Sequence, residues 1–387
     1  MSWPTVSLGD VLTPAGERIA LDPDTTYAQV TARLWGKGLA LRGEVKGSEI
    51  AAAQQNRVRA GQFVVSKIDA RHGAFGIVPD MLDGAVVSND FPVFDIAADR
   101  VDSGYVAWIS RTHWFVALCK NASEGSTNRV RLKEVRFLSQ EVPLPPLTEQ
   151  RRIVARLDAA AAAVSARAQA AAAVEAEIAA TLRAAFARIT ADAPRLRMGD
   201  VAPLVRRPVT IDPDATYLEL GVRSFGRGLF AKPDLTGADL TWQSLYRIEA
   251  GDLVFSNIKA WEGAFAVAGP EHGGKHGSHR YLTCVPDPDR ATAGYLWYYL
   301  QSEEGLHQIG QASPGSADRN RTLATKRLDA ITVPVPSLDA QQWFDRLQAK
   351  ARGARMMQAD AAAELAQLLP AMLDEAFGEQ DQSAGGT

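Results

Sequence analysis

The stretch AGQFVVSKI at positions 60–68 recurs 190 positions later as AGDLVFSNI at positions 250–258. In both places a glycine and one polar residue precede three apolar residues. A serine, a second polar residue and an isoleucine follow them. Short apolar runs bounded by turn residues are typical of strands. The recurrence indicates that one strand-containing unit occurs twice in the chain. Such a repeat must be recognised first, because the prediction of domains and fold depends on it.

The repeat extends in both directions from this stretch. It holds without a gap from residue 8 to about residue 131, where LGDV 8–11 matches MGDV 198–201 and WGKGL 35–39 matches FGRGL 225–229. After one inserted residue it resumes at a spacing of 191, so that VPLP 142–145 matches VPVP 333–336. Solenoids stack three or more repeats of about 20–50 residues. Two long units instead indicate a pseudo-two-fold molecule.

The first part of each unit, residues 1–140 and 195–332, carries the signals of a compact α+β domain. Apolar residues at three- and four-residue spacing predict helix over Ser103–Leu118 and Ala291–Ile309. Short apolar runs bounded by Gly, Asp and Pro predict strands. These strands are Gln62–Ile68, Phe75–Val78, Phe91–Ile96, Asp252–Ile258 and Phe265–Ala268.

The second part of each unit is predicted to be one long helix that follows a proline-rich start. Thr148 and Asp339 stand at equivalent places and are suitable N-caps, whereas Pro370 should kink or interrupt the second helix. Apolar residues recur at spacings near three, four and seven, as in amphipathic or coiled-coil helices. The residues assigned to this packing stripe are Ile153, Leu157, Val164, Ile178, Leu182, Phe186, Phe344, Leu347, Leu365, Met372 and Phe377.

These features predict an α+β fold with two tandem domains and two long helices that pair antiparallel and hold the domains apart. A solvated linker helix is the alternative, which the apolar stripe disfavours. The expected boundaries are 1–145 for the first domain, 146–191 for the central helix, 192–336 for the second domain, 337–379 for the C-terminal helix and 380–387 for a disordered tail.

Composition sets limits on the class of protein. Apolar residues make up 46% and charged residues 22%, as in ordinary soluble proteins, and the alanine-rich run is broken by Arg and Glu, so no membrane span is expected. Only Cys119 and Cys284 are present and no signal peptide is visible, which favours the cytoplasm. The net charge of −3 argues mildly against nucleic acid, although local basic patches can still meet phosphate.

Four segments resemble the specificity subunits of type I restriction–modification systems. PLPPLTEQRRIVARLD 143–158 is similar to their central conserved region, LLPAMLDEAF 368–377 to their C-terminal one, and the two strand stretches to the motif of their target-recognition domains. The second copy departs from the pattern, since Ala340-Gln341-Gln342 stands where Glu149-Gln150-Arg151 would repeat.

The resemblance implies the function. Each target-recognition domain would read one half of a bipartite, asymmetric site in double-stranded DNA, and the helices would set the unread gap. The helices would also dock two methyltransferase subunits that bind S-adenosylmethionine and methylate adenine. Two translocase–nuclease subunits, which use ATP and magnesium, would complete the restriction complex. The chain itself would hold no cofactor and no catalytic residue.

Three loop sets in each copy offer side chains suited to DNA, because base edges and phosphates are met by Arg, Lys, Asn and Gln. Residues that are basic in both copies suit phosphate, and residues that differ suit base reading; a solvated surface charge is the alternative for any single one. The candidates are Arg33, Lys37, Lys67, Arg71, His72, Asn128, Arg129, Arg131, Arg223, Arg227, Asn257, Lys259, Trp261, Arg319, Asn320 and Arg321.

Enzyme and metal interpretations have weaker support. Asp24 with Glu44-Val45-Lys46 has the spacing of a magnesium-dependent nuclease, but the second copy lacks the lysine. The histidines at 272, 276 and 279, near Cys284, have zinc-like spacing in a Gly-rich stretch where a solvated or DNA-facing loop is the alternative. No phosphate-binding loop and no methyltransferase signature is present, so chemistry is expected from partners. A scaffold that organises proteins without reading DNA remains the alternative function.

Overall fold

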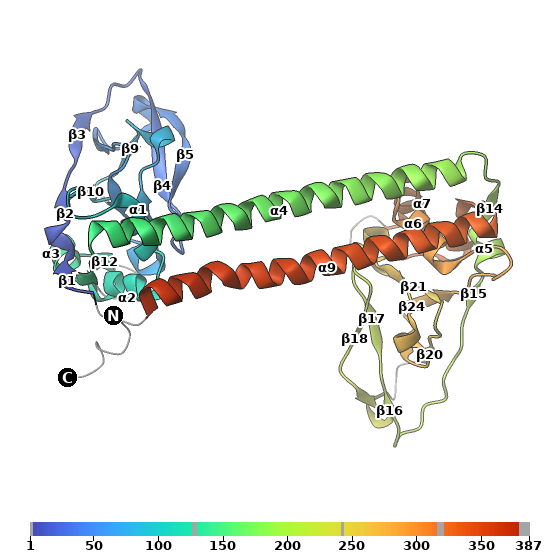
Figure 1. Ribbon diagram of the computed structural model, residues 1–387. Coiled ribbons are helices and arrows are strands. Elements are labelled where there is room, and N and C mark those ends of the chain that lie inside the picture. The colour runs from blue at the N-terminus through green and yellow to red at the C-terminus, as the bar shows by residue number, and fades with distance from the viewer. Residues whose placement is uncertain (1–2, 126–129, 241–243, 316–320, 379–387) are drawn as a thin grey trace. The chain divides into compact units, whose positions relative to one another are not determined.

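The computed structural model describes residues 3–125, 130–240, 244–315 and 321–378, and Figure 1 traces its elements. The chain divides into two compact units. Unit 1 joins the two ends of the sequence, Met1–Ala170 and Ala359–Thr387, and unit 2 is Ala171–Gln358. This division runs through both long helices rather than along their ends. The predicted tail, 380–387, lies outside the described residues.

Among its described residues, unit 1 contains two larger sheets. The first is antiparallel, in the order β2 (Leu12–Pro14), β10 (Val93–Ile96), β7 (Phe63–Val65) and β8 (Phe75–Ile77). The second is mixed, in the order β3 (Glu17–Ala20), β6 (Gln54–Arg57), β9 (Val86–Val87), β4 (Thr26–Ala32) and β5 (Leu39–Lys46). The strands predicted in this unit are confirmed as β7, β8 and β10, each shorter than expected.

The recurring stretch is apolar throughout because its strand separates two cores. Successive side chains of a strand point to opposite faces. On β7, Phe63 and Val65 belong to the larger core beside the helices, whereas Val64 belongs to a smaller core beneath the mixed sheet. In unit 2, β21 (Leu253–Ser256) repeats this arrangement, with Leu253 and Phe255 on one side and Val254 on the other.

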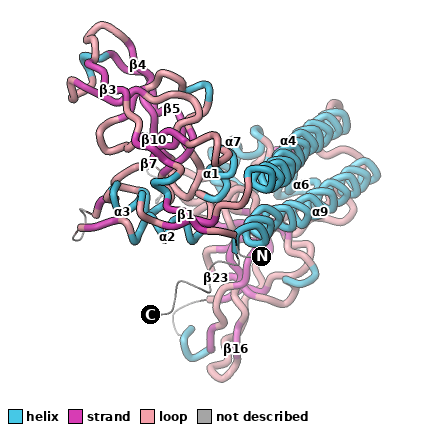
Figure 2. The backbone as a smooth tube through the Cα atoms, turned by 60° about the vertical axis from the view of Figure 1, so that its left-hand side comes forward, coloured by secondary structure: helices cyan, strands magenta, loops and turns pink. Residues whose placement is uncertain are grey.

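Short elements complete unit 1. They are β1 (Thr5–Ser7) paired with β13 (Glu141–Pro143), β11 (Ser123–Glu124) paired with β12 (Arg131–Leu132), and the helices α1 (Ser103–Ile109), α2 (His113–Asn121) and α3 (Glu134–Leu138). Figure 2 shows β3, β4 and β5 gathered in one part of the unit and α2 and α3 in another. The single helix predicted over Ser103–Leu118 is wrong, because Thr112 accepts a hydrogen bond from the Phe115 N–H (3.3 Å) and starts a second helix.

Unit 2 repeats the antiparallel sheet in the order β15 (Leu204–Val205), β24 (Tyr281–Cys284), β21 and β22 (Phe265–Val267). Among the described residues, four two-stranded pairs accompany it: β14 (Arg195–Arg197) with β25 (Thr332–Pro334), β16 (Thr216–Tyr217) with β19 (Leu235–Thr236), β17 (Leu220–Val222) with β18 (Leu229–Ala231), and β20 (Leu245–Arg247) with β23 (His276–Ser278). Its short helices are α5 (Met198–Val201), α6 (Ala293–Gln301), α7 (Glu303–Ala312) and α8 (Thr325–Asp329). The helix predicted over Ala291–Ile309 is again two, because Ser302 caps α7.

The two long helices are α4 (Leu147–Thr190) and α9 (Leu338–Phe377). The predicted N-caps, Thr148 and Asp339, are wrong, since both lie inside the first turn, and the Ser337 hydroxyl accepts from the Ala340 N–H at 3.4 Å. α9 runs through Pro370 without interruption. No helix among the described residues is long and apolar enough to cross a membrane.

Within each unit the start of one long helix lies antiparallel to the end of the other. In unit 1 Arg156 of α4 pairs with Glu375 of α9, and in unit 2 Arg355 of α9 pairs with Glu175 of α4 at 2.7 Å. Of the predicted packing residues, all except Val164 and Leu365 belong to, or pack against, the large core of their unit. Each helix therefore contributes to two cores, one at each end.

A buried glutamine joins each helix to its domain. The Gln150 side-chain oxygen accepts from the Asp102 N–H (2.8 Å), and its nitrogen donates to the carbonyls of Pro145 (2.7 Å) and Arg100 (3.1 Å). Gln341 makes the matching three bonds, to the N–H of residue 292 and the carbonyls of residues 336 and 290. Both side chains are fully buried, which fixes the start of each helix.

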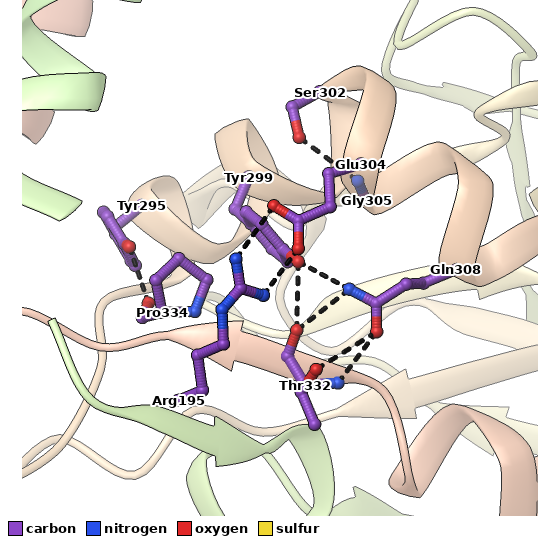
Figure 3. Close-up of polar contacts among 9 residues, drawn as sticks. All are labelled: Arg195, Tyr295, Tyr299, Ser302, Glu304, Gly305, Gln308, Thr332 and Pro334. Carbon is purple, nitrogen blue, oxygen red and sulfur yellow. Dashed lines mark hydrogen bonds and ion pairs between the residues drawn. The ribbon is translucent and has the colours of Figure 1, made fainter. Parts of the chain in front are cut away.

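Polar contacts also hold the strand that leads into α9 (Figure 3). The Tyr295 hydroxyl donates to the Pro334 carbonyl at 2.6 Å, as that of Tyr105 does to the Pro143 carbonyl at 2.9 Å in unit 1. In unit 2 alone, Arg195 forms a two-pronged ion pair with Glu304, at 2.5 and 3.1 Å. The hydrogen bonds from Arg195 lower the pKa of the Glu304 carboxyl. These contacts orient the helix relative to its own domain.

Candidate nucleic-acid interface

Three loops that are distant in the sequence meet in unit 1. We call them the first loop (33–38), the second loop (66–73, with the 3-10 helix η3, Ala70–His72) and the third loop (described residues 121–125 and 130–132). The N–H groups of Trp35 and Gly36 donate to the carbonyls of His72 (2.8 Å) and Gly73 (2.9 Å). The Leu132 N–H donates to the Lys67 carbonyl at 2.8 Å. The second loop therefore holds the other two in place.

Unit 2 builds the same cluster from residues 223–228, 256–263 (with η7, Ala260–Glu262) and the described residues 311–315 and 321–323. The N–H groups of Phe225 and Gly226 donate to the carbonyls of Glu262 (2.8 Å) and Gly263 (3.0 Å). The Leu323 N–H donates to the Asn257 carbonyl at 2.7 Å. The three-loop cluster is thus a property of the repeated unit, and its side chains differ between the copies.

Glycine at the end of the second loop permits this docking. Gly73 has a φ of +78°, and a Cβ there would lie 2.8 Å from the Gly36 nitrogen. Gly263 has a φ of +76°, and a Cβ there would lie 3.1 Å from the side-chain oxygen of Gln301. A side chain at either position would have a strained backbone, and at Gly73 it would also push the first loop away.

The predicted DNA-binding residues fall into three groups by position. Those exposed on the cluster are Arg33, Lys37, Arg131, Arg223 and Arg227. Those half-buried in it are Lys67, Arg71, His72, Asn257, Lys259, Trp261 and Arg321. Those that lie outside the described residues are Asn128, Arg129, Arg319 and Asn320. The structure brings the first two groups together within each unit, and their contact with DNA stays a prediction.

Several of these basic groups have a carboxylate partner. Lys67 Nζ lies 2.7 Å from Glu134, Lys259 Nζ lies 2.7 Å from Glu262, and Arg131 pairs with Asp90. By contrast, Arg33, Lys37, Arg223 and Arg227 form no ion pair with any part of the chain that the structure describes. The first loop of each unit therefore carries the cations most available to phosphate.

The second loops present different chemistry at the same place. In unit 1, Arg71 Nε donates to His72 Nε2 at 3.1 Å. In unit 2 the counterpart of Arg71 is Trp261, whose ring lies under the Arg321 guanidinium (4.5 Å) and the Lys259 ammonium (5.3 Å). A guanidinium donor and an indole ring offer different chemistry to a ligand, so the two clusters differ at this position.

Asn257 has an unusual environment within the second cluster. Its side-chain oxygen is buried and has no hydrogen-bond partner among the residues that the structure describes. A buried polar atom without a partner costs free energy, and such atoms are rare in folded proteins. The position corresponds to Lys67 in unit 1, so the two copies also differ here.

Sequence reasoning missed three residues at these clusters. Trp35 and Phe225 occupy the tips of the first loops with 70% of their surface exposed. Arg111 stacks over Trp108, with its guanidinium carbon 4.2 Å from the ring centre, and burial lowers its pKa. Arg111 and Trp35 line one groove of about 520 Å³ in unit 1. The sequence carried no signal for Arg111, because it falls in a segment predicted to be helix.

The alternative metal interpretation finds no assembled site among the residues that the structure describes. Within the described part of the chain, no group of three or more His, Cys, Asp and Glu side chains is arranged to hold a metal ion. His272 Nδ1 accepts from the Gly269 N–H at 2.9 Å, and His276 packs edge-on against Tyr217. Cys284 is buried in β24, where burial raises the pKa of its thiol to about 12.

Comparison with known proteins identifies the fold. No family model matches the chain, and no curated protein sequence matches it. Among solved structures, the HsdS subunit of Thermoanaerobacter tengcongensis is 21% identical, with a TM-score of 0.59 over 97% of this chain and 96% of that one. A structure described as explaining complex assembly and conformational transition of the type I R-M system is also 21% identical, with a TM-score of 0.66 over 97% of both chains.

A third similar structure is the S subunit of a type I restriction-modification system from M. genitalium, 11% identical, with a TM-score of 0.51 over 97% of this chain and 96% of that one. All three likenesses span nearly the whole chain. They confirm the predicted fold of two α+β domains with two long helices.

Proposed function

We propose that this chain is the DNA-specificity subunit of a type I restriction–modification system. One observation carries the proposal: each unit builds the same three-loop cluster, but fills it with different side chains. A duplicated scaffold with unlike clusters suits a protein that reads two different half-sites, because pseudo-symmetric proteins meet half-sites at a defined spacing. The full-length likeness to type I specificity subunits supports it.

The long helices are proposed to set the unread gap between the half-sites and to dock two methyltransferase subunits. Continuous helices that contribute to a core at each end are suited to fix a distance, since a helix rises about 1.5 Å per residue. The proposed partners would bring S-adenosylmethionine for adenine methylation, and two restriction subunits would bring ATP and magnesium. This chain would then supply recognition and no catalysis.

Genome-wide mapping of adenine methylation tests the proposal. A host that carries this gene and its methyltransferase partner is compared with the same host from which this gene is deleted. We expect a two-part motif with an unread gap to be methylated only in the presence of the gene. Unchanged methylation would contradict the proposal and favour the scaffold alternative.

A loop exchange tests the division of labour between the units. Residues 256–263 (SNIKAWEG) can be replaced by their counterparts 66–73 (SKIDARHG), which keeps the serine and glycine at the ends. We expect one half of the methylated motif to change and the other to stay. A change in both halves, or in neither, would show that the second loops do not read separate half-sites.

The scaffold alternative makes an opposite prediction for the purified complex with its methyltransferase subunits. A reader neutralises phosphates, so its affinity for DNA should fall steeply as salt rises. A scaffold without DNA contact would show weak binding with no preference for the methylated motif. Competition between motif and scrambled duplexes at fixed salt separates the two.

A further inference from the structure

The first loops place a large aromatic side chain in an unusual backbone conformation. Trp35 has a φ of 64° and Phe225 a φ of 62°, and they are the only non-glycine residues with positive φ in the described part of the chain. Positive φ is unfavourable for residues with a bulky side chain. The two residues occupy equivalent positions of the repeat, so the same strain is present twice.

The rings of these residues are presented to solvent rather than used for packing. Each has 70% of its surface exposed, and neither belongs to a hydrophobic core. The residue type changes from Trp to Phe between the copies, whereas ring, exposure and backbone conformation are kept. Strain at a solvent-facing position indicates a function that is not stability.

The backbone beneath each ring is firmly held. Two N–H groups of the first loop donate to the second loop in both units, and the Ser224 hydroxyl also donates to the Glu262 carboxylate at 2.9 Å. The Trp35 ring meets the edge of the His72 imidazole, with 6.2 Å between the centres. Each ring therefore projects from a backbone that is anchored to the second loop.

A cation stands two residues before and two residues after each ring in the sequence: Arg33 and Lys37 around Trp35, and Arg223 and Arg227 around Phe225. Arg33, Trp35 and Lys37 line one groove, and the Arg227 guanidinium carbon lies 5.8 Å from the centre of the Phe225 ring, whereas Arg223 stacks over Phe230. A projecting apolar ring between two cations matches nucleic acid, in which apolar base faces lie between lines of phosphate. A protein partner would need an acidic surface with an apolar centre.

We propose that Trp35 and Phe225 contact DNA bases directly, one ring at each half-site, as apolar wedges that pack against a base while the flanking cations hold phosphates. The inference rests on the proposed function and names residues that perform it. The positive φ serves to aim the ring away from the domain, which a residue in an ordinary conformation at the loop tip would not do.

The test measures, at several salt concentrations, how tightly the complex of this chain with its methyltransferase subunits binds a DNA duplex that carries the methylated motif. Trp35→Ala should weaken binding roughly 10- to 100-fold, since base–aromatic stacking has this size, and should leave the salt slope unchanged because no charge is lost. Lys37→Ala is the matched control on the same loop. Its affinity for DNA should fall, and the slope of log affinity against log salt concentration should decrease in magnitude by about one. Affinity of Trp35→Ala within twofold of wild type would overturn the proposal.

A second variant separates DNA contact from a structural role. Trp35→Gly removes the ring and relieves the strained φ, so its Tm should not fall while its DNA affinity does. A drop in Tm together with unchanged affinity would assign the ring to stability. If the variant binds the methyltransferase subunits less well but keeps the DNA affinity of the wild type, the Trp35 ring belongs to a protein interface. Both outcomes overturn the proposal.

The assignment of one ring to each half-site needs duplexes altered in one half at a time. Trp35→Ala should lose discrimination at one half and Phe225→Ala at the other. If both variants affect the same half, the assignment is wrong. If the wild-type complex shows no preference for any duplex, the proposed function itself has failed, a result distinct from failure of these variants alone.

Discussion

Gln341 and Gln342 are neighbours in α9 with opposite surroundings: Gln341 is fully buried and makes three hydrogen bonds, whereas Gln342 is exposed. We expect Gln341→Ala to lower the free energy of unfolding by about 2–4 kcal/mol, because buried partners lose their hydrogen bonds. Gln342→Ala should stay within about 0.5 kcal/mol of wild type. Denaturant unfolding measures both. If both variants change the free energy of unfolding equally, the hydrogen bonds of the buried Gln341 amide do not stabilise the protein.

We expect His276 to make the stability of unit 2 sensitive to acid. Burial lowers the pKa of its imidazole from 6.5, and its Nδ1 is buried without a partner among the described residues. Below pH 6.5 the unfolded chain binds a proton that the folded chain resists, so stability falls as the pH decreases. Its counterpart in unit 1 is Val86, which cannot titrate.

The repeat supplies the substitution that tests this acid sensitivity. We expect His276→Val to flatten the dependence of Tm on pH between about 6.5 and 5, where an ordinary histidine titrates. Stability at pH 8 should be equal or higher, since the variant removes a buried unpartnered nitrogen. Thermal unfolding across this range is the measurement. A profile parallel to that of the wild type would show that another group governs acid sensitivity.

Which single side chains are exposed was the least predictable property at this scale. The matching of Trp35 with Phe225 was evident in the sequence, but a large aromatic residue is ordinarily buried. Only the structure shows that these rings face solvent and that their backbone has positive φ. Likewise, the match between Gln150 and Gln341 was visible, yet their burial depends on contacts about fifty residues away.

At the scale of elements, periodicity located strands and helices better than their ends. The stretches at 60–68 and 250–258 contain β7 and β21. These strands could be predicted because a short apolar run is a signal within the segment itself. The breaks between paired helices were missed, since apolar spacing continues across Thr112 and Ser302. Ser and Thr are favoured N-caps, and that signal would have located both breaks.

The end of α4 is held by an aromatic cluster in unit 2. The Phe186 ring stacks on Tyr295, with 5.5 Å between centres and 24° between planes, and lies 5.5 Å from Phe344. We expect Phe186→Ala to lower the free energy of unfolding by about 2–4 kcal/mol through the cavity it leaves. Val174→Ala is the control, since Val174 lies on the same helix and is 41% exposed.

Denaturant unfolding with equal protein concentrations compares these two variants. The control should remain within about 0.5 kcal/mol of wild type, as exposed substitutions usually do. If both variants lower the free energy of unfolding equally, the buried Phe186 ring stabilises unit 2 no more than the exposed Val174 side chain does.

At the scale of the whole chain, the repeat predicted two equal units but not how they divide the sequence. Unit 1 recruits the last turns of α9, where Phe377 packs against Tyr105 at 5.6 Å between ring centres. Unit 2 uses the last turns of α4 in the same way, through Phe186 and Tyr295. Such an exchange of helix ends depends on contacts between distant segments, which local patterns do not encode.

This exchange predicts the behaviour of half the chain. A polypeptide of residues 1–191 keeps one domain and α4 but loses the segment that places Phe377 on Tyr105. Phe186 is the repeat counterpart of Phe377 and contacts the counterpart of Tyr105 in unit 2. We therefore expect two copies to associate, each offering its Phe186 to the other's Tyr105, because a self-complementary surface closes as a two-fold dimer.

Sedimentation velocity of the 1–191 polypeptide should give the mass of a dimer at micromolar concentration. Phe186→Asp in the same polypeptide is the control, and should shift it toward monomer because a charge cannot enter the aromatic cluster without large cost. With methyltransferase subunits the dimer should methylate a symmetric site that repeats one half-site, since two identical readers meet inverted half-sites. A folded monomer would show that the helix ends are not interchangeable between the units.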